Sequence, residues 1–216
     1  NMAYVSMVRG SIPFLLLSYI IPDWDIVSAD EITIEGENME EMLERERLYM
    51  QESMDAAIIN AYQAAGADIS ITGAISEVSY IAEEADTNLK IGDEIVRVND
   101  VEIHSLDDLR AIIEELDEDE QVQLDVIRDD EELECYAYTY NTDDGMKIGV
   151  SLLTTYEYTT NPEVSITSKA SEAGSSGGLM MSLTIYNSLV PEDITGGKKI
   201  VGTGTIDIDG NVGEIG

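Results

Sequence analysis

The sequence predicts an α+β protein with a small β-rich module in the middle of the chain. From Met39 onward the spacing of apolar residues is helical, whereas from about residue 68 to 153 short strand patterns surround a single helix. After Pro162 the pattern changes again, to a loop of small residues that leads into a helix. Two mixed segments therefore flank a module made mainly of strands.

The first long element is a helix. Its apolar positions recur at three- and four-residue steps, which places them on one helical face, and Gly66 stands where the helix is expected to end. These positions are Leu43, Met50, Met54, Ala57, Ile58, Ala61 and Ala65.

Ahead of this helix we expect a short strand over residues 2–8 and strand character over residues 31–34. The longest apolar run, residues 14–21, has eight residues and lies between Pro13 and Pro22. A membrane-spanning helix requires roughly 20 apolar residues, so this run is interpreted as a core element.

The β-rich module is predicted to contain five strands and one helix over residues 105–116, with Ser105 capping the helix ahead of Asp107 and Asp108. The strands are expected over residues 69–71, 74–78, 94–98, 122–127 and 133–140. Beyond it we expect a strand over 163–166, a helix that ends near Leu189 and a glycine-punctuated strand pair across 199–215.

Composition excludes several classes of function. The chain has 45 acidic and 11 basic side chains, a formal charge of -34, which would repel nucleic acid and anionic membrane surfaces. The single cysteine, Cys135, is expected to be a buried apolar thiol, and the single histidine, His104, a structural turn residue. One cysteine and one histidine form no zinc-type cluster, and we expect neither a metal nor a cofactor.

The loop over residues 171–178 carries the candidate chemistry. Its composition is that of a flexible glycine-serine linker, but it is short and leads directly into the amphipathic stretch that starts at Leu179. A serine at the start of a helix is surrounded by unpaired N–H groups that stabilise an oxyanion. The Gly-Lys-Ser/Thr ending of a nucleotide-binding loop is absent from it.

Residues 174–180 (GSSGGLM) resemble the nucleophile motif of the Lon-type serine peptidases, in which Gly-Pro-Ser-Ala-Gly precedes a helix. Residues 50–57 (MQESMDAA) are similar to the first long helix of that family's proteolytic domain. Downstream, residues 193–197 (DITGG), 202–207 (GTGTID) and 210–216 (GNVGEIG) are similar to the stretch that leads toward its catalytic lysine.

Between these segments, residues 89–100 (LKIGDEIVRVND) and 105–109 (SLDDL) resemble a bacterial PDZ domain of the protease-associated kind. The order of the segments is that of the PDZ-containing Lon-like proteases of Gram-positive bacteria. The resemblance implies a Lon-type proteolytic domain formed by residues 1–67 and 157–216, interrupted by a PDZ-like domain over residues 68–156.

The resemblance implies that Ser176 is the nucleophile of a Ser-Lys dyad, with Thr203 orienting the lysine. Backbone N–H groups near Gly174 to Ser176, those of Gly174 and Ser175 above all, are expected to hold the oxyanion. Ser175 replaces the proline of the motif and is a second candidate nucleophile, and a structural role for the Thr203 hydroxyl stays open. The lysine itself is expected shortly beyond Gly216. The lysines within the chain are interpreted as solvated cations; they are Lys90, Lys147, Lys169, Lys198 and Lys199.

For the PDZ-like module, we expect a peptide to add as a strand beside residues 73–78, with its C-terminal carboxylate held by N–H groups around residues 71–73. The predicted peptide-binding residues are Ile71, Thr72, Gly73, Ala74 and Ile75. A scaffold insertion with a degenerate groove is the alternative.

These observations favour an ATP-independent serine endopeptidase that acts on protein or peptide substrates. The resemblance implies a membrane anchor ahead of this sequence and a location on the outer face of the cell membrane. Two alternatives stay open, namely a catalytically inactive peptide sensor and an assembly scaffold, since Lon proteolytic domains form homo-oligomeric rings.

Overall fold

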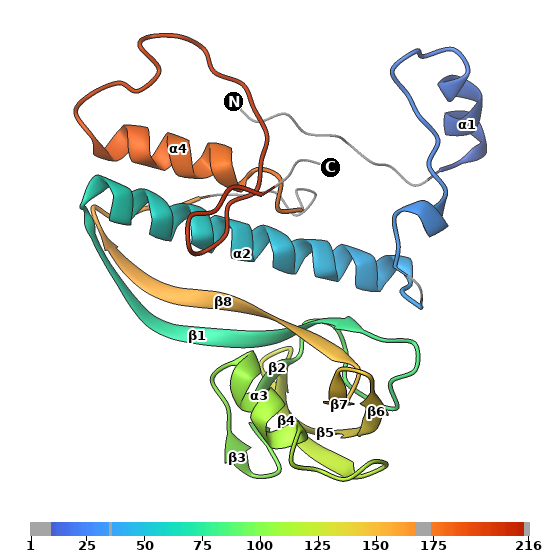
Figure 1. The fold of residues 1–216 in the computed structure, drawn as a ribbon. Helices are drawn as coiled ribbons and strands as arrows, with labels where there is room; N and C mark the ends of the chain where they lie inside the picture. The colour runs from blue at the N-terminus through green and yellow to red at the C-terminus, as the bar shows by residue number, and fades with distance from the viewer. Residues whose placement is uncertain (1–9, 35, 167–173, 214–216) are drawn as a thin grey trace.

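The computed structural model describes residues 10–34, 36–166 and 174–213. Its longest element is helix α2, Met39–Ala65, which confirms the predicted helix (Figure 1). Asn38 caps α2 by accepting hydrogen bonds from the N–H groups of Glu40 and Glu41. At the other end Gly66 takes the left-handed conformation with φ of +64°, as expected of a helix-ending glycine.

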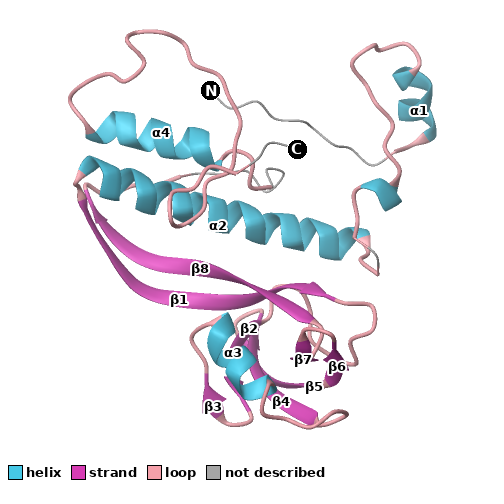
Figure 2. Cartoon of the chain, in the orientation of Figure 1, coloured by secondary structure: helices cyan, strands magenta, loops and turns pink. Residues whose placement is uncertain are grey.

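Two long antiparallel strands, β1 (Asp68–Ile81) and β8 (Val150–Asn161), form a ribbon that starts at the C-terminal end of α2. Figure 2 shows this ribbon curving along α2 and entering the small β-rich unit. Helix α4, Gly178–Leu189, lies alongside α2 and confirms the predicted second helix. Ile58, Tyr62 and Ile185 pack together between these two helices and the ribbon.

The β-rich unit holds the main hydrophobic core. Its sheet is antiparallel with strand order β5-β4-β2-β1-β8, and β3 pairs with β2. The further elements are β2 (Glu94–Val98), β3 (Val101–Glu102), α3 (Leu106–Ile113), β4 (Gln121–Arg128), β5 (Glu131–Tyr138), β6 (Tyr140–Thr142) and β7 (Gly145–Lys147). Ser105 accepts a hydrogen bond from the Asp108 N–H, which confirms the predicted cap of α3.

A buried ion pair ties this core together. The Asp93 side chain is fully buried and receives two hydrogen bonds from Arg128, at 2.6 Å from Nε and 2.7 Å from an Nη atom. Such bidentate geometry satisfies both carboxylate oxygens of a buried Asp. Cys135 lies in the same core, as expected, and burial raises the pKa of its thiol.

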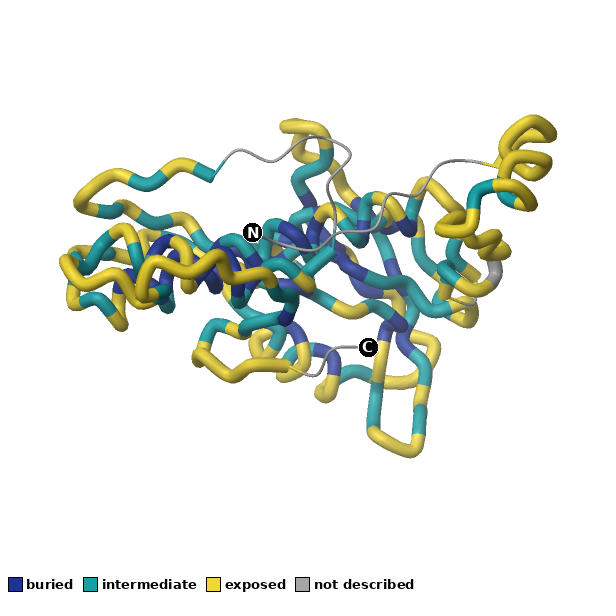
Figure 3. The backbone as a smooth tube through the Cα atoms, turned by 90° about the horizontal axis from the view of Figure 1, so that it is seen from above, coloured by how far each residue is buried: buried dark blue, intermediate teal, exposed yellow. Residues whose placement is uncertain are grey.

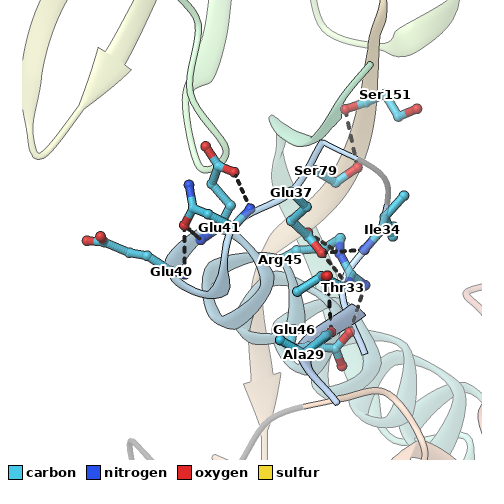
Figure 4. A network of polar contacts seen from close by, with 11 residues as sticks. Ala29, Thr33, Ile34, Glu37, Glu40, Glu41, Arg45, Glu46, Ser79 and Ser151 are labelled. Carbon is cyan, nitrogen blue, oxygen red and sulfur yellow. Dashed lines mark hydrogen bonds and ion pairs between the residues drawn. The ribbon is translucent and has the colours of Figure 1, made fainter. Parts of the chain in front are cut away.

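A second buried pair holds the segment before α2 against that helix. Arg45 bonds both carboxylate oxygens of Glu37, at 2.7 and 3.1 Å, and also reaches Glu46 (Figure 4). Burial opposes ionisation of Glu37, but the Arg45 guanidinium outweighs it and lowers the pKa of Glu37.

Several predicted strands differ from those of the structure. The strands expected at 69–71 and 74–78 are parts of the single strand β1, which has an irregularity between Ile71 and Gly73. Residues 31–34 and 163–166 are not strands. Of the strand pair expected across 199–215, the described residues 199–213 form an irregular loop with an isolated bridge between Ile206 and Val212. The strand expected at 2–8 lies outside the described residues.

The apolar run that we expected in the core is exposed instead. It forms the short helix α1, Ile12–Ser18, which has no buried residue and is drawn almost wholly as exposed in Figure 3. Leu16 and Ile20 are 63% and 75% exposed, and Phe14 contacts Trp24 edge to face. Among the described residues, no helix is long and apolar enough to cross a membrane.

Candidate functional site: a serine loop and a groove beside β8

The loop that carries the predicted nucleophile is fastened to α2. Gly174 donates its N–H to the Glu46 carbonyl at 3.0 Å, and the buried Ser53 hydroxyl donates to the Ser175 carbonyl at 2.9 Å. Gly178 begins α4, and a Cβ there would collide with the Ser53 hydroxyl. The glycine is therefore required for the close approach of α4 to α2.

The structure brings Ser176 and Thr203 together. The carbonyl of Ser176 accepts hydrogen bonds from the Gly204 N–H at 2.7 Å and from the Thr203 hydroxyl at 2.9 Å. The Thr203 hydroxyl thus satisfies the backbone next to the candidate nucleophile, which is the structural role left open by the sequence. The Ser176 residue is itself exposed.

One predicted oxyanion donor is already engaged. Because Gly174 gives its N–H to Glu46, that group is not available to a ligand, and this part of the prediction is corrected. No hydrogen bond to another described residue is found for the N–H groups of Ser175 and Ser176. These two N–H groups therefore remain the candidate donors to an oxyanion.

A pocket of about 330 Å³ opens beside Ser175, between α2 and the loop over residues 205–213. Its wall is held by Asp207, whose carbonyl accepts from Asn60 of α2 and whose carboxylate accepts from the Asn211 side chain and N–H. The hydrogen bonds from Asn211 lower the pKa of Asp207. Ser175 lines this serine-loop pocket, whereas Ser176 is not among its lining residues.

Among the described residues, no candidate general base is hydrogen-bonded to either serine. No lysine, histidine or carboxylate among them makes a hydrogen bond to the hydroxyl of Ser175 or Ser176. Lys169 lies outside the described residues. The other lysines are exposed, as expected of solvated cations; they are Lys90, Lys147, Lys198 and Lys199.

The predicted peptide-binding residues lie away from the groove. Residues 71–75 pair with β8, in the register Ile71 to Tyr158, Gly73 to Glu157 and Ile75 to Thr155. None of them lines a pocket beside α3. The predicted position is therefore corrected, because the strand that lies opposite α3 is β8 and not this part of β1.

The groove beside α3 is a pocket of about 560 Å³ between that helix and the start of β8. Its apolar lining includes Leu106, Leu109 and Ile113 from α3 and Ile148, Val150 and Leu152 from the facing segment. Two of the few cations of the chain, Arg110 and Lys147, also line it.

The outer edge of β8 is open along this pocket. Gly149 accepts a hydrogen bond from Ala82, and the Ser151 carbonyl accepts one from the Ser79 hydroxyl, so these two residues face β1. The N–H and C=O groups of successive strand residues point to opposite sides of the strand. Those of the residues between and after these two therefore point away from β1. The outward-facing residues are Val150, Leu152 and Thr154. Because β8 ends the sheet order, no described strand covers them.

The segment just before β8 bends at Gly149. Gly149 has φ of +74°, a conformation that favours glycine. A Cβ at this position would also lie only 2.6 Å from the Ala85 Cβ, so there is no room for a larger residue. No described residue bonds the N–H groups of Ile148 and Gly149. Successive free N–H groups in such a turn capture carboxylates.

A comparison with protein families finds a match to the PDZ domain at residues 73–137. Residues 73–137 form a PDZ domain. We therefore call the groove beside α3 the PDZ pocket. The match runs from inside β1 to inside β5 and includes the whole of α3. A search of curated proteins finds no match for this chain.

PDZ domains bind peptides or proteins, commonly by adding an extended peptide to a sheet edge. In this chain the residues that match the PDZ domain include α3. The facing strand β8 lies after the matched residues and begins at Val150. The sequence does contain a signal for the start of the facing strand. Gly149 stands between Ile148 and Val150, immediately ahead of an alternating strand pattern.

His104 stays outside both sites. It lies between β3 and α3, is exposed, and its N–H donates to the Asp108 carboxylate at 2.9 Å. This placement agrees with the turn role that the sequence predicts.

Proposed function

We propose that the PDZ domain of this chain binds the C-terminal end of a peptide or protein as an added strand beside β8. The observation that carries the proposal is the open outer edge of β8 opposite α3, ahead of which stand the free N–H groups of Ile148 and Gly149. Those N–H groups hold the terminal carboxylate, and the apolar wall of α3 takes the last side chain.

The test is fluorescence anisotropy with a five-residue peptide that ends in an apolar residue, either with a free carboxylate or with a C-terminal amide. Loss of a charge-assisted hydrogen-bond set costs about 1.5–3 kcal/mol, so amidation is expected to weaken binding about tenfold to a hundredfold. Equal binding of the two peptides would contradict capture of a chain end.

A matched pair of glycine variants tests the position of this carboxylate site. Gly149→Ala forces a Cβ against Ala85 and is expected to abolish most of the binding. Gly66→Ala, at the end of α2, strains a left-handed glycine in open space and should leave the affinity unchanged. If the two variants bind alike, the carboxylate is held elsewhere.

We further propose that the serine loop belongs to an ATP-independent serine endopeptidase with a Ser-Lys dyad. The support is the resemblance of residues 174–180 to the Lon-type nucleophile motif, together with the pocket beside Ser175. In this mechanism the serine hydroxyl attacks the peptide carbonyl while a lysine of lowered pKa takes its proton. The N–H groups of Ser175 and Ser176 hold the oxyanion.

Cleavage of an unfolded protein tests this second proposal. The chain, with whatever residues its gene encodes after Gly216, should degrade casein without ATP, and Ser176→Ala should abolish the cleavage. Loss of cleavage in Ser175→Ala alone would move the nucleophile to Ser175. An inactive protein that still binds peptides would favour the inactive peptide sensor.

The same resemblance leads us to propose a location on the outer face of the cell membrane and assembly into a homo-oligomer. Fractionation of cells with protease protection tests the location, and light scattering of the purified protein tests the assembly.

A further inference from the structure

Three hollows of the surface adjoin one another along β8. Between the PDZ pocket and the serine-loop pocket lies a third hollow of about 450 Å³, which we call the edge hollow. It shares Leu106 and Leu152 with the PDZ pocket, and it shares Tyr49 and Glu52 with the serine-loop pocket. The shared wall residues place the three hollows in a row between α3 and the serine loop, and we refer to this row as the groove.

The direction of a bound peptide follows from where its carboxylate is held. A peptide whose end lies at the start of β8 runs antiparallel to that strand, so its upstream residues pass Leu152 and Thr154. Strand addition then ends, because the N–H of Tyr156 already donates to the Asp55 carboxylate at 2.9 Å. At about 3.4 Å per residue, about five peptide residues lie along the edge before the peptide reaches α2.

The part of α2 that the peptide reaches is acidic. Glu52 is half-buried and makes no ion pair among the described residues. Burial raises the pKa of Glu52, and the charges of Asp55 and Asp207 raise it further. The Arg45 guanidinium lies 5.6 Å from the centre of the Tyr49 ring and is already held by Glu37 and Glu46. An unsatisfied carboxylate in this setting favours a cationic partner.

We propose that one extended peptide fills the whole groove, with its apolar last residue in the PDZ pocket and a lysine or arginine, about six residues before its end, against Glu52. This inference rests on the proposed PDZ function and names the class of ligand for it. The residues upstream of that cation enter the serine-loop pocket beside Ser175, so the groove leads from the recognition site to the candidate nucleophile.

The test compares three synthetic peptides on the purified chain at physiological salt. One has five residues, and two have ten residues that differ only in carrying lysine or glutamine at the sixth position before the end. The lysine peptide should bind about fivefold to tenfold more tightly than the glutamine peptide, as for a partly buried ion pair. In Glu52→Gln this advantage should disappear.

The matched control is Glu40→Gln, which removes the same charge from the exposed first turn of α2. It should keep the advantage of the lysine peptide. If that advantage also survives in Glu52→Gln, it reflects general attraction to a chain of charge -34, and the proposal is overturned. Equal binding of the two longer peptides would overturn it too, while the PDZ function would stand if the five-residue peptide binds. Failure of all three peptides to bind would remove both.

Discussion

Asp55 joins helix α2 to strand β8 through a single buried carboxylate. It is 1% exposed and accepts hydrogen bonds from the Tyr156 N–H at 2.9 Å, the Gln51 amide at 2.9 Å and the Tyr158 hydroxyl at 3.3 Å. Burial raises the pKa of Asp55, and these donors act against that rise. The residue thus fixes β8 to α2 and ends the open strand edge.

Replacing Asp55 by alanine is expected to lower the free energy of unfolding by about 2 kcal/mol, because it leaves buried donors without an acceptor. Urea unfolding followed by circular dichroism measures this change. Asp209→Ala, an exposed carboxylate in the loop beside the serine-loop pocket, should change it by less than about 0.5 kcal/mol. Equal effects of the two variants would show that the Asp55 contacts contribute nothing.

At this scale, residues with a local role could be predicted from the sequence. Gly66 ends α2 and Ser105 caps α3 because each acts on backbone a few residues away. The role of Gly149 depends on Ala85 and on strand β1, which are distant in sequence. The residues around Gly149 indicate where a strand begins, but they do not show this role.

The elements that could be predicted are those whose burial follows a simple period. Helix α2 shows a helical apolar face, and β2 and β4 lie close to their predicted bounds. Strand β8 was not predicted, because its Thr-rich half pairs with β1 outside the core of the β-rich unit. For the same reason the groove was placed on β1, since long-range pairing decides which strand faces α3.

For the short helix α1, the predicted burial is wrong. Its apolar composition predicted burial, but no described element packs over it. Composition gives the tendency of a segment to leave water, and it does not say which surface receives that segment.

The cap of α3 gives a prediction for the wall of the PDZ pocket. Ser105→Ala removes the acceptor for the Asp108 N–H and should cost about 1 kcal/mol of folding stability, measured by thermal unfolding. Ser105→Asp keeps an acceptor at the cap and should retain most of that stability. Equal losses in the two variants would mean that the cap bond is not what stabilises α3.

Across the whole molecule, an excess of negative charge lowers the stability of the fold. The formal charge of -34 repels itself in the compact state, and burial in addition raises the pKa values of Glu52, Glu77 and Glu94 above their ordinary 4.5. A carboxyl with a raised folded-state pKa binds its proton more tightly in the folded chain than in the unfolded chain. Protonation of these groups therefore stabilises the fold.

We accordingly expect the free energy of unfolding to increase as pH falls from 7 toward about 5, since the folded state takes up more protons over this range. Urea titrations at several pH values give the slope. Glu52→Gln should make the slope shallower, because it removes one of the contributing groups, whereas Glu40→Gln should leave it nearly unchanged. A stability that falls over this range would contradict the assignment.

The central claim is that the ligand-binding edge of this PDZ domain is the start of β8. Amide NMR of the ¹⁵N-labelled chain, titrated with a five-residue peptide that has an apolar C-terminal residue and a free carboxylate, tests it most directly. The structure predicts shifts at residues 148–152 and along α3, with little change at residues 71–75. Shifts concentrated at residues 71–75, with residues 148–152 unaffected, would contradict it.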